Sequence, residues 1–246
     1  MTPTQRQRYA RQIRLDSVGE QGQQRLLDAN VLVIGLGGLG SPAAMYLAAS
    51  GIGRLVISDF DRVESSNLQR QIAHREQDIG EPKAASAKRT LQALNPECAV
   101  EAIDWELDDD ELDARVAAAD VVLDCTDNFA SRFQINRIAV AHDTALVTAA
   151  AIRREGQILT CLPGGRPCYQ CVYPKQLEHQ ETCAMEGVLA PVVGVMGSLQ
   201  ALQAIQVLLG DTDALRGTML LFDAATMHWQ RIQVGGRADC PVCGSS

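Results

Sequence analysis

The sequence predicts a Rossmann-like α/β fold, with a doubly wound, mostly parallel sheet and a mixed C-terminal end. Apolar runs typical of buried parallel strands alternate with segments that suit helices along most of the chain. The first of these runs leads directly into the glycine-rich turn GLGGLG at Gly35–Gly40. Two Cys-x-x-Cys pairs stand far apart in the sequence and together can close a tetrahedral zinc site. We therefore expect a structural zinc site on this fold.

At 246 residues, of which 46% are hydrophobic, the chain is long enough for one large α/β domain, which we expect to span residues 1–246. Its formal net charge of −8 argues against nonspecific binding to nucleic acid or to an anionic membrane, because both depend on excess Lys and Arg. The N-terminus lacks the apolar segment of a secretory signal, so we expect a cytoplasmic protein.

The first half of the chain alternates between strand and helix. A polar, arginine-rich segment over about residues 1–30 suits an N-terminal helical arm. The continuous apolar run at 30–35 predicts a buried strand, and the run at 54–61 predicts a second strand that ends in acids. Pro82 suits the first turn of a helix, where its missing N–H leaves no hydrogen bond unmade. The elements expected after the arm are strands at 30–35, 54–61 and 98–103 and helices at 41–51, 82–94 and 108–119.

The second half continues this alternation and then becomes irregular. A strand at 120–128 ends in polar residues, and a helix at 129–142 follows it. Residues 163–186 form a long irregular segment that carries the first cysteine pair. The apolar stretch 188–209 predicts a largely buried helix rather than a membrane span, because a proline, glycines and three glutamines interrupt it. The remaining strands are expected at 146–151, 157–162, 219–224 and 228–234, the last two as a hairpin.

Three of the predicted strands end at residues suited to a ligand site. Gly35, Asp59 and Asp127 all fall at or beyond carboxyl ends of strands, where open α/β sheets bind ligands. The turn fits G-x-G-x-x-G through Gly35, Gly37 and Gly40, and such a turn lets the backbone approach phosphate closely. Asp59 can accept hydrogen bonds from ribose hydroxyls. A dinucleotide, a mononucleotide and a glycine turn without a ligand are all compatible with these features.

Two basic residues follow the second strand and favour a triphosphate. Arg70 lies in SNLQRQ, and Lys83 lies at the start of the next helix. A dehydrogenase needs no cations there, because backbone N–H groups hold its pyrophosphate. A triphosphate carries more charge, and Arg and Lys stabilise both it and the pyrophosphate that leaves. Either residue alone suits a solvated surface charge, whereas their joint position indicates ATP.

Asp127, in DCTDN, is a candidate ligand of Mg²⁺, which binds through one or two carboxylates plus substrate phosphates. The alternative is that Asp127 or Asn128 only caps the helix that follows. Asp124 is expected to belong to the end of the strand.

The two cysteine pairs are Cys168/Cys171 and Cys240/Cys243. A redox dithiol is the alternative for such a motif, but it normally stands alone near the start of a thioredoxin-like unit. Four thiolates leave no open position for water, so the metal should be structural. It should join the loop at 163–186 to the C-terminus at 240–243.

The remaining cysteines call for separate interpretations. Cys183 lies between Glu181 and Glu186, which would raise the pKa of its thiol. On its surroundings alone, it suits a small apolar filler in the loop. Cys98, Cys125 and Cys161 lie in predicted strands and are expected in the core, and the four histidines show no ligand spacing.

The chain resembles the ThiF/MoeB/HesA family, bacterial relatives of the ubiquitin-activating enzymes, from about Arg8 to Gly244. The resemblance rests on RYARQIRL, GLGGLGSPAA, DFDRVESSNLQRQ, CTDN, CYQC, GVMGSLQALQAI and CPVCG. It implies ATP-dependent adenylylation of the C-terminal glycine carboxylate of a small ubiquitin-fold sulfur carrier protein. It also implies a homodimer, in which Arg11 reaches the ATP site of the other subunit, and a cysteine at the position of Cys183 that can bind the activated carrier covalently. The implied ATP site comprises Gly38, Asp59, Ser66, Asn67, Arg70, Lys83, Asp127 and Asn128.

Other activities and two pathways stay open on the sequence alone. An NAD-dependent oxidoreductase shares the glycine turn and Asp59 but does not account for Arg70, Lys83 and Asp127 together. A non-catalytic scaffold would be expected to lack the cations, and a family relative could activate a non-protein carboxylate. AAAIRREGQ resembles MoeB, whereas GVMGSLQALQAI, HWQR and CPVCG resemble ThiF. Both a ThiS-like carrier in thiamine synthesis and a MoaD-like carrier in molybdopterin synthesis therefore fit, with a sulfurtransferase or cysteine desulfurase as a candidate partner.

Overall fold

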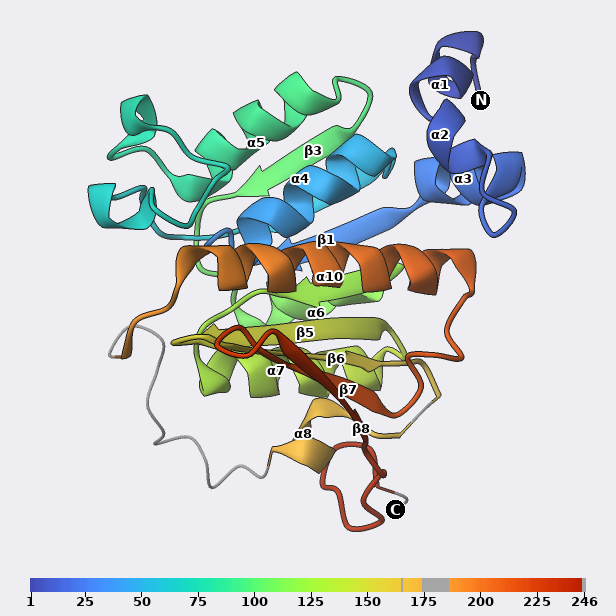
Figure 1. Ribbon diagram of the computed structural model, residues 1–246, viewed down its shortest axis with the longest axis vertical. Coiled ribbons are helices and arrows are strands. Elements are labelled where there is room, and N and C mark those ends of the chain that lie inside the picture. Colours follow the sequence, from blue (N-terminus) through green and yellow to red (C-terminus); the bar gives the residue numbers. More distant parts are fainter. Residues whose placement is uncertain (165, 174–185, 245–246) are drawn as a thin grey trace.

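The computed structural model describes residues 1–164, 166–173 and 186–244 (Figure 1). These residues contain one eight-stranded sheet in the order β3-β2-β1-β4-β5-β6-β7-β8. The pairs among β3, β2, β1, β4 and β5 are parallel, and the pairs from β5 to β8 are antiparallel. The predicted doubly wound sheet with a mixed C-terminal end is thus confirmed. The strands are β1 (Asn30–Ile34), β2 (Arg54–Ser58), β3 (Ala99–Ile103), β4 (Val121–Asp124), β5 (Ala145–Ile152), β6 (Glu155–Cys161), β7 (Thr218–Asp223) and β8 (His228–Gln233).

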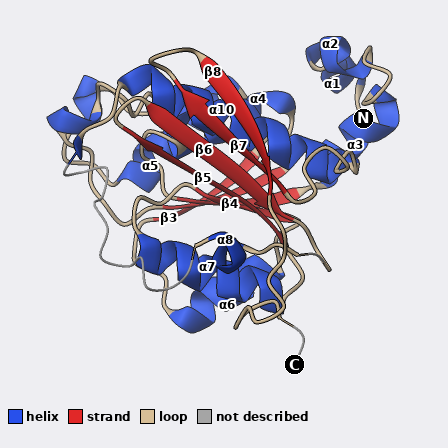
Figure 2. Cartoon of the chain, turned by 60° about the horizontal axis from the view of Figure 1, so that its bottom comes forward, coloured by secondary structure: helices blue, strands red, loops and turns tan. Residues whose placement is uncertain are grey.

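Helices cover both faces of the sheet (Figure 2). One face carries α4 (Gly40–Ser50), α5 (Lys83–Leu94) and α10 (Ala190–Leu209), and the other carries α6 (Asp109–Ala117), α7 (Phe129–Ala141) and α8 (Tyr169–Val172). Alternation along the central strands supplies both cores: Val31 and Val33 face the first helix layer, and Leu32 faces the second. The continuous apolar runs in the sequence therefore correspond to strands that are buried on both faces.

The N-terminal arm forms three short helices rather than one long helix. These are α1 (Pro3–Arg8), α2 (Ala10–Ile13) and α3 (Gly19–Asp28), and they lie near the end of the sheet where β1 begins (Figure 1). Tyr9, at the break between α1 and α2, is only 3% exposed, and its hydroxyl accepts a 2.9 Å hydrogen bond from Asn95. This contact with a residue far along the chain fixes Tyr9 against the body of the protein.

By length and composition alone, α10 could cross a membrane, yet 44% of its most apolar window is buried inside the protein. The helix packs against α4 and β5. Gln200, fully buried on it, donates to the carbonyls of Asp124 at 2.8 Å and Val147 at 3.2 Å. These polar contacts to the sheet fit the predicted buried helix.

Candidate active site and metal centre

Strand register brings the expected site residues to one edge of the sheet. Ile34, the last residue of β1, pairs with Ser58 of β2 and with Asp124 of β4. Gly35, Asp59 and Cys125 are the first residues after these three neighbouring strands, so they lie side by side. This is the carboxyl edge at which doubly wound sheets bind ligands.

The glycine turn is tight enough to require glycine at specific positions. Gly35 has φ of +89° and donates its N–H to the carbonyl of Ser58 at 2.8 Å. A Cβ on Gly40 would lie 1.8 Å from the Gly35 oxygen, and one on Gly38 would lie 2.7 Å from a Val193 methyl. The α4 helix begins at Gly40, so its N-terminal end and its dipole face the same edge.

Both backbone polar groups of Leu36, in this turn, are hydrogen-bonded to side chains. Asp59 accepts the Leu36 N–H at 2.7 Å, and its other oxygen accepts the Asp61 N–H at 2.9 Å. The Leu36 carbonyl accepts a 3.1 Å hydrogen bond from His74 Nε2 and a 3.1 Å hydrogen bond from the Ser41 hydroxyl. Because a carbonyl only accepts, His74 Nε2 must carry a proton. Asp59 thus helps to build the turn, in addition to any contact with a ribose.

His74 is a site residue that the sequence did not indicate. It is 6% exposed, and its Nδ1 lies 2.9 Å from the Ser86 hydroxyl, which also lies 2.8 Å from Asp78. Burial lowers the pKa of His74 and raises that of Asp59, whose carboxylate Lys83 partly stabilises. No local motif marks His74, since its partner Leu36 lies 38 residues away.

The two expected cations lie on this side of the molecule with partners of their own. Lys83 is 6% exposed, and its Nζ lies 2.8 Å from Asp61, a carboxylate that the sequence did not single out. Arg70 donates to the carbonyl of Ser66 at 3.0 Å. Asn67 is buried and accepts the Glu64 N–H at 3.2 Å, so it closes the 3₁₀ turn that carries Ser66.

After β4, Asp127 and Asn128 have different roles. Asn128 caps α7 by accepting the Ser131 N–H at 2.9 Å, so the helix-cap alternative holds for Asn128. Asp127 is exposed, and it makes no hydrogen bond or ion pair with another described residue. Asp124 is fully buried and accepts from Thr126 and Thr148, each at 2.7 Å, as expected for the end of a strand. Asp127 is therefore the carboxylate in this loop that is available to a metal ion.

Arg11 and Cys183 are not brought to this edge within the described chain. Arg11 is exposed on α2, near the beginning of β1, whereas the glycine turn follows the end of β1 (Figure 1). Its expected contact with another subunit stays a prediction. Cys183 lies outside the described residues.

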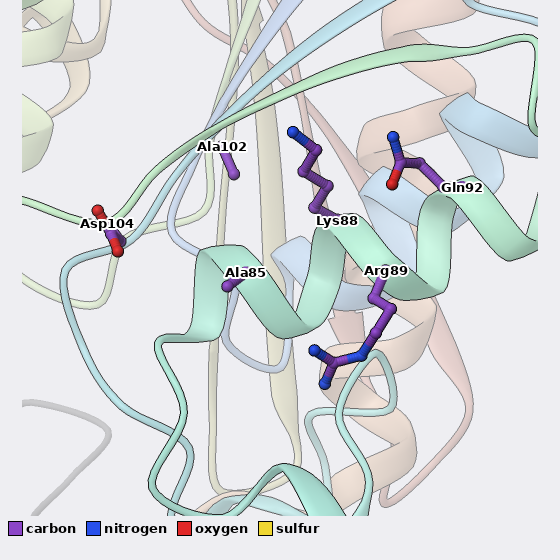
Figure 3. Close-up of a pocket in the computed structure, with 6 residues that line it drawn as sticks. All are labelled: Ala85, Lys88, Arg89, Gln92, Ala102 and Asp104. Atoms are coloured by element: carbon purple, nitrogen blue, oxygen red, sulfur yellow. The ribbon is translucent and has the colours of Figure 1, made fainter.

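A pocket of about 380 Å³ lies between α5 and the end of β3 (Figure 3). Figure 3 shows Lys88 and Arg89 leaving α5 in opposite directions. Arg89 is paired with Asp78 at 2.6 Å and Glu81 at 2.7 Å. The sequence did not indicate any of the lining residues as part of a ligand site. They are Ala85, Lys88, Arg89, Gln92, Ala102 and Asp104.

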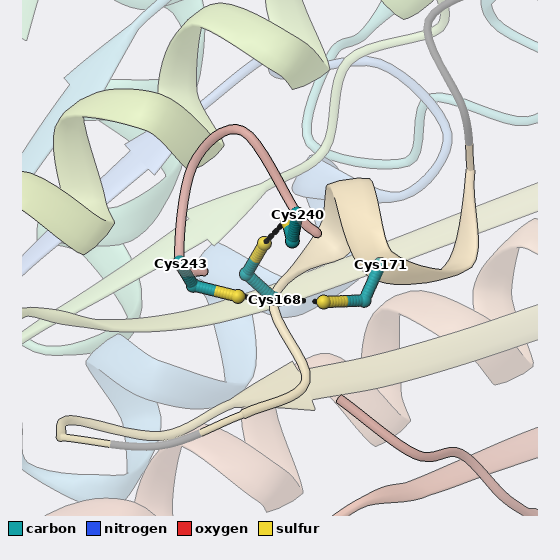
Figure 4. A group of neighbouring side chains, drawn as sticks. All are labelled: Cys168, Cys171, Cys240 and Cys243. Atoms are coloured by element: carbon teal, nitrogen blue, oxygen red, sulfur yellow. Dashed lines mark hydrogen bonds between the residues drawn. The ribbon is translucent and has the colours of Figure 1, made fainter. Parts of the chain in front are cut away.

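The four cysteines of the two pairs converge (Figure 4). All four sulfurs lie within 4.8 Å of one another, with Cys168 and Cys240 at 3.6 Å and Cys171 and Cys243 at 3.3 Å. These separations are too long for a disulfide, which has about 2.05 Å between sulfurs. They approach the roughly 3.8 Å edge of a tetrahedron with metal–sulfur bonds of about 2.3 Å. The donor set and its geometry fit a zinc ion.

Thiol acidity differs within this cluster. Burial raises the pKa of Cys168. Burial acts the same way on Cys240, but the N–H groups of Cys243 and Val242 outweigh it and lower the pKa to about 7. The cysteines expected in the core are buried, and burial raises the pKa of Cys98 to about 11 and of Cys161 to about 12.

The ThiF family matches residues 9–242 of this chain. The chain belongs to the ThiF family. It is 48% identical over 241 residues to the sulfur carrier protein ThiS adenylyltransferase of Escherichia coli (strain K12), covering 97% of this chain and 95% of that protein. It is 44% identical to the molybdopterin-synthase adenylyltransferase of the same strain, covering 96% of each.

The chain is also similar to part of a longer relative and to a more distant solved structure. The chain is 45% identical to an adenylyltransferase and sulfurtransferase of Mus musculus, over 96% of this chain but 52% of that protein. The crystal structure of Escherichia coli MccB with ATP has a TM-score of 0.84 at 25% identity, covering 96% of this chain and 73% of MccB. The resemblance inferred from the sequence motifs is confirmed.

Proposed function

We propose that this chain uses ATP to adenylylate the C-terminal glycine carboxylate of a small ubiquitin-fold sulfur carrier protein. The observation that carries the proposal is the placement of Gly35, Asp59 and the Asp127 loop on three neighbouring strand ends. Lys83 is close enough to stabilise the Asp59 carboxylate, and Arg70 precedes Gln71, whose side chain reaches the glycine turn at Gly37. The chain is also 48% identical, over nearly its whole length, to an enzyme named for this reaction. Residues 1–246 are proposed to act as a single adenylation domain.

In the proposed complex, the glycine turn and the N-terminus of α4 receive the phosphates of ATP. The backbone of Gly38 is proposed to contact a phosphate, and Asp59 is proposed to accept from the ribose hydroxyls. Lys83 can serve a phosphate oxygen while it remains paired with Asp61, because an ammonium group has three donors. Arg70 adds a second positive charge, and Ser66, Asn67 and Asn128 are proposed to line the same site.

Asp127 is proposed to hold Mg²⁺ together with the phosphates, as one exposed carboxylate suits an ion that keeps most of its other ligands as water or phosphate. The ion would neutralise charge on the phosphates. Asn128 and the first turn of α7 fix the backbone that follows Asp127.

The chemical step needs no general base. An oxygen of the carrier carboxylate attacks the α-phosphorus, the bond to the β-phosphate oxygen breaks, and pyrophosphate leaves with the electron pair. Catalysis then depends on positioning and on neutralising charge. Lys83 and Arg70 supply this from the same chain, and Arg11 is proposed to supply it from the other subunit of a homodimer.

The surface offers a candidate face for that homodimer. Val195 and Leu202, seven residues apart on α10, are 37% and 52% exposed, and Tyr46 on the adjoining α4 is 57% exposed. Residues spaced by seven lie on one side of a helix. We propose that this apolar face of α4 and α10 meets its copy.

The four-cysteine cluster is proposed to bind a structural Zn²⁺ that joins the segment before α8 to the C-terminal segment. The carrier is ThiS-like or MoaD-like, and a sulfurtransferase or cysteine desulfurase is the proposed source of sulfur. Cys183 is proposed to bind the activated carrier covalently, and the site of action is proposed to be the cytoplasm.

The deciding experiment is carrier-dependent exchange of labelled pyrophosphate into ATP, run with a ThiS-like and with a MoaD-like carrier. We expect wild type to exchange with at least one carrier and Asp127→Ala to lose exchange while keeping its zinc content. Asp213→Ala, an exposed acid away from the sheet edge, is the matched control and should exchange normally. Full exchange in Asp127→Ala would refute the metal assignment, and no exchange by wild type with either carrier would refute the function.

Nucleotide class is tested separately by thermal melting, since a ligand raises the Tm of the state that it binds. ATP with Mg²⁺ should raise the Tm, and NADH should not. A rise with NADH alone would instead support the oxidoreductase alternative.

A further inference from the structure

Asn136 is a fully buried residue of α7 whose side chain contacts the cysteine cluster. Its Nδ2 donates to the Cys168 sulfur at 3.7 Å, and its Oδ1 accepts the Tyr169 N–H at 2.9 Å. A single amide thus holds both the sulfur of one proposed ligand and the backbone of the next residue. No motif in the sequence indicated this residue.

The negative charge of the proposed zinc site explains why a hydrogen-bond donor such as Asn136 Nδ2 lies beside it. One Zn²⁺ with four thiolates carries a net charge of −2, in a cluster whose Cys168, Cys171 and Cys240 are buried. A buried negative charge needs hydrogen-bond donors. The Arg237 backbone N–H supplies one to Cys171 at 3.4 Å. Outside the cysteines themselves, Asn136 is the only side chain in the described ranges with a hydrogen bond to any of the four sulfurs.

The amide is carried on a well-anchored helix. Asn128 caps the start of α7, and Arg132 donates to the Thr126 carbonyl at 2.6 Å. Asn128, Arg132 and Asn136 are spaced by four residues, so they form one polar stripe along the helix. Phe133 packs edge-on against the Tyr169 ring, with 5.7 Å between centroids. A donor held by a rigid element orients a ligand more accurately than one on a loop.

We propose that Asn136 is a positioning residue of the zinc site, acting through the Cys168 sulfur. Its Nδ2–H offsets the charge of the Cys168 thiolate, and its Oδ1 fixes the backbone that links Cys168 to Cys171. This inference rests on the proposed zinc site and is independent of the adenylylation reaction.

The test measures zinc affinity of the full chain by competition with a chromophoric chelator, with the absorption of the Co²⁺-loaded protein as a second readout. The variants are Asn136→Ala, which removes both contacts, and Asn136→Asp, which keeps an acceptor for Tyr169 but puts a carboxylate beside the sulfur. The matched control is Asn95→Ala. Asn95 is also buried, at 1% exposed, but it bonds to Tyr9 and to the Ala48 carbonyl.

We expect about 10- to 100-fold weaker zinc binding in Asn136→Ala, and still weaker binding in Asn136→Asp. The Co²⁺ spectrum should shift in both. Asn95→Ala should lose stability yet keep wild-type zinc affinity. Asn136→Asp is nearly isosteric, so it decides the matter alone should Asn136→Ala fail to fold.

Two results would overturn the inference while leaving the zinc site in place. One is unchanged zinc affinity in Asn136→Asp. The other is a loss in Asn95→Ala as large as that in the Asn136 variants, which would mean that general destabilisation explains the effect. A wild-type protein that binds neither Zn²⁺ nor Co²⁺ would instead refute the zinc proposal itself, whatever the outcome of pyrophosphate exchange.

Discussion

Leu36 shows how single residues build the proposed site. Asp59 holds its N–H, and His74 together with Ser41 holds its carbonyl. Asp59 was predicted because it follows an apolar strand, which is a local feature. His74 was not, because its importance depends on a contact with a peptide 38 residues earlier in the chain.

Titration of His74 should make stability depend on pH. Burial lowers its pKa in the folded protein below the value of about 6.5 in the unfolded chain. Between these two pKa values the unfolded state therefore binds more protons than the folded state. The contribution of neutral His74 to the free energy of unfolding is complete above pH 6.5 and is lost as the pH falls below that value. We expect the Tm to decrease from pH 7.5 to pH 5 by differential scanning fluorimetry.

The comparison for this titration is His74→Gln, whose amide can donate to the Leu36 carbonyl without titrating. Its Tm should vary less with pH over the same window. Asp78 does not interfere there: burial would raise its pKa, but hydrogen bonds from Ser86, Arg75 and Arg89 outweigh that and lower the pKa below its usual value. Equal slopes for wild type and His74→Gln would show that another group is responsible.

In the turn between β1 and α4, some glycines are needed for packing, whereas another matters only for ligand binding. A Cβ on Gly40 would overlap the Gly35 carbonyl at 1.8 Å, which no side-chain adjustment can relieve. A Cβ on Gly37 would meet only the end of the Gln71 side chain, at 3.6 Å. The same motif therefore contains glycines that the fold requires, such as Gly40, and one, Gly37, that the fold does not require.

We expect Gly40→Ala to lose on the order of 3 kcal/mol of unfolding free energy or more. Gly37→Ala should stay within about 1 kcal/mol of wild type but bind ATP more weakly, because a methyl group would stand where phosphate approaches the turn. Urea denaturation and calorimetric ATP titration measure the two effects. Wild-type ATP affinity in Gly37→Ala would argue against phosphate at this position.

The order and type of most elements followed from the sequence, because buried strands appear as continuous apolar runs and the helices between them carry caps or terminal glycines. The arm was less predictable. Its division at Tyr9 depends on the hydrogen bond from Asn95, 86 residues away. The 3₁₀ turn at Ser65–Asn67 likewise depends on the contacts of Glu64 with Asn67, which no periodic pattern reveals.

At the scale of the whole molecule, the proposed homodimer makes a specific prediction. Leu202→Glu places a charge on the apolar face of α4 and α10, so it should shift wild-type dimers toward monomers in size-exclusion chromatography with light scattering. Pyrophosphate exchange should fall with it, since Arg11 would no longer reach the other subunit. Leu94→Glu changes a 40% exposed leucine on α5 and should leave the dimer intact. A monomeric wild type would refute both the dimer and this role of Arg11.

The sequence by itself determined the alternation of strands and helices, the glycine turn, the candidate acids at strand ends and the two cysteine pairs, because each is encoded within a few neighbouring residues. Only the tertiary structure decided the strand order that sets Asp59 and the Asp127 loop beside one turn. It also decided the pairing of Lys83 with Asp61, the hold of His74 on Leu36 and that of Asn136 on Cys168. These contacts join residues that the folded sheet brings together, and local sequence patterns carry no record of such distances.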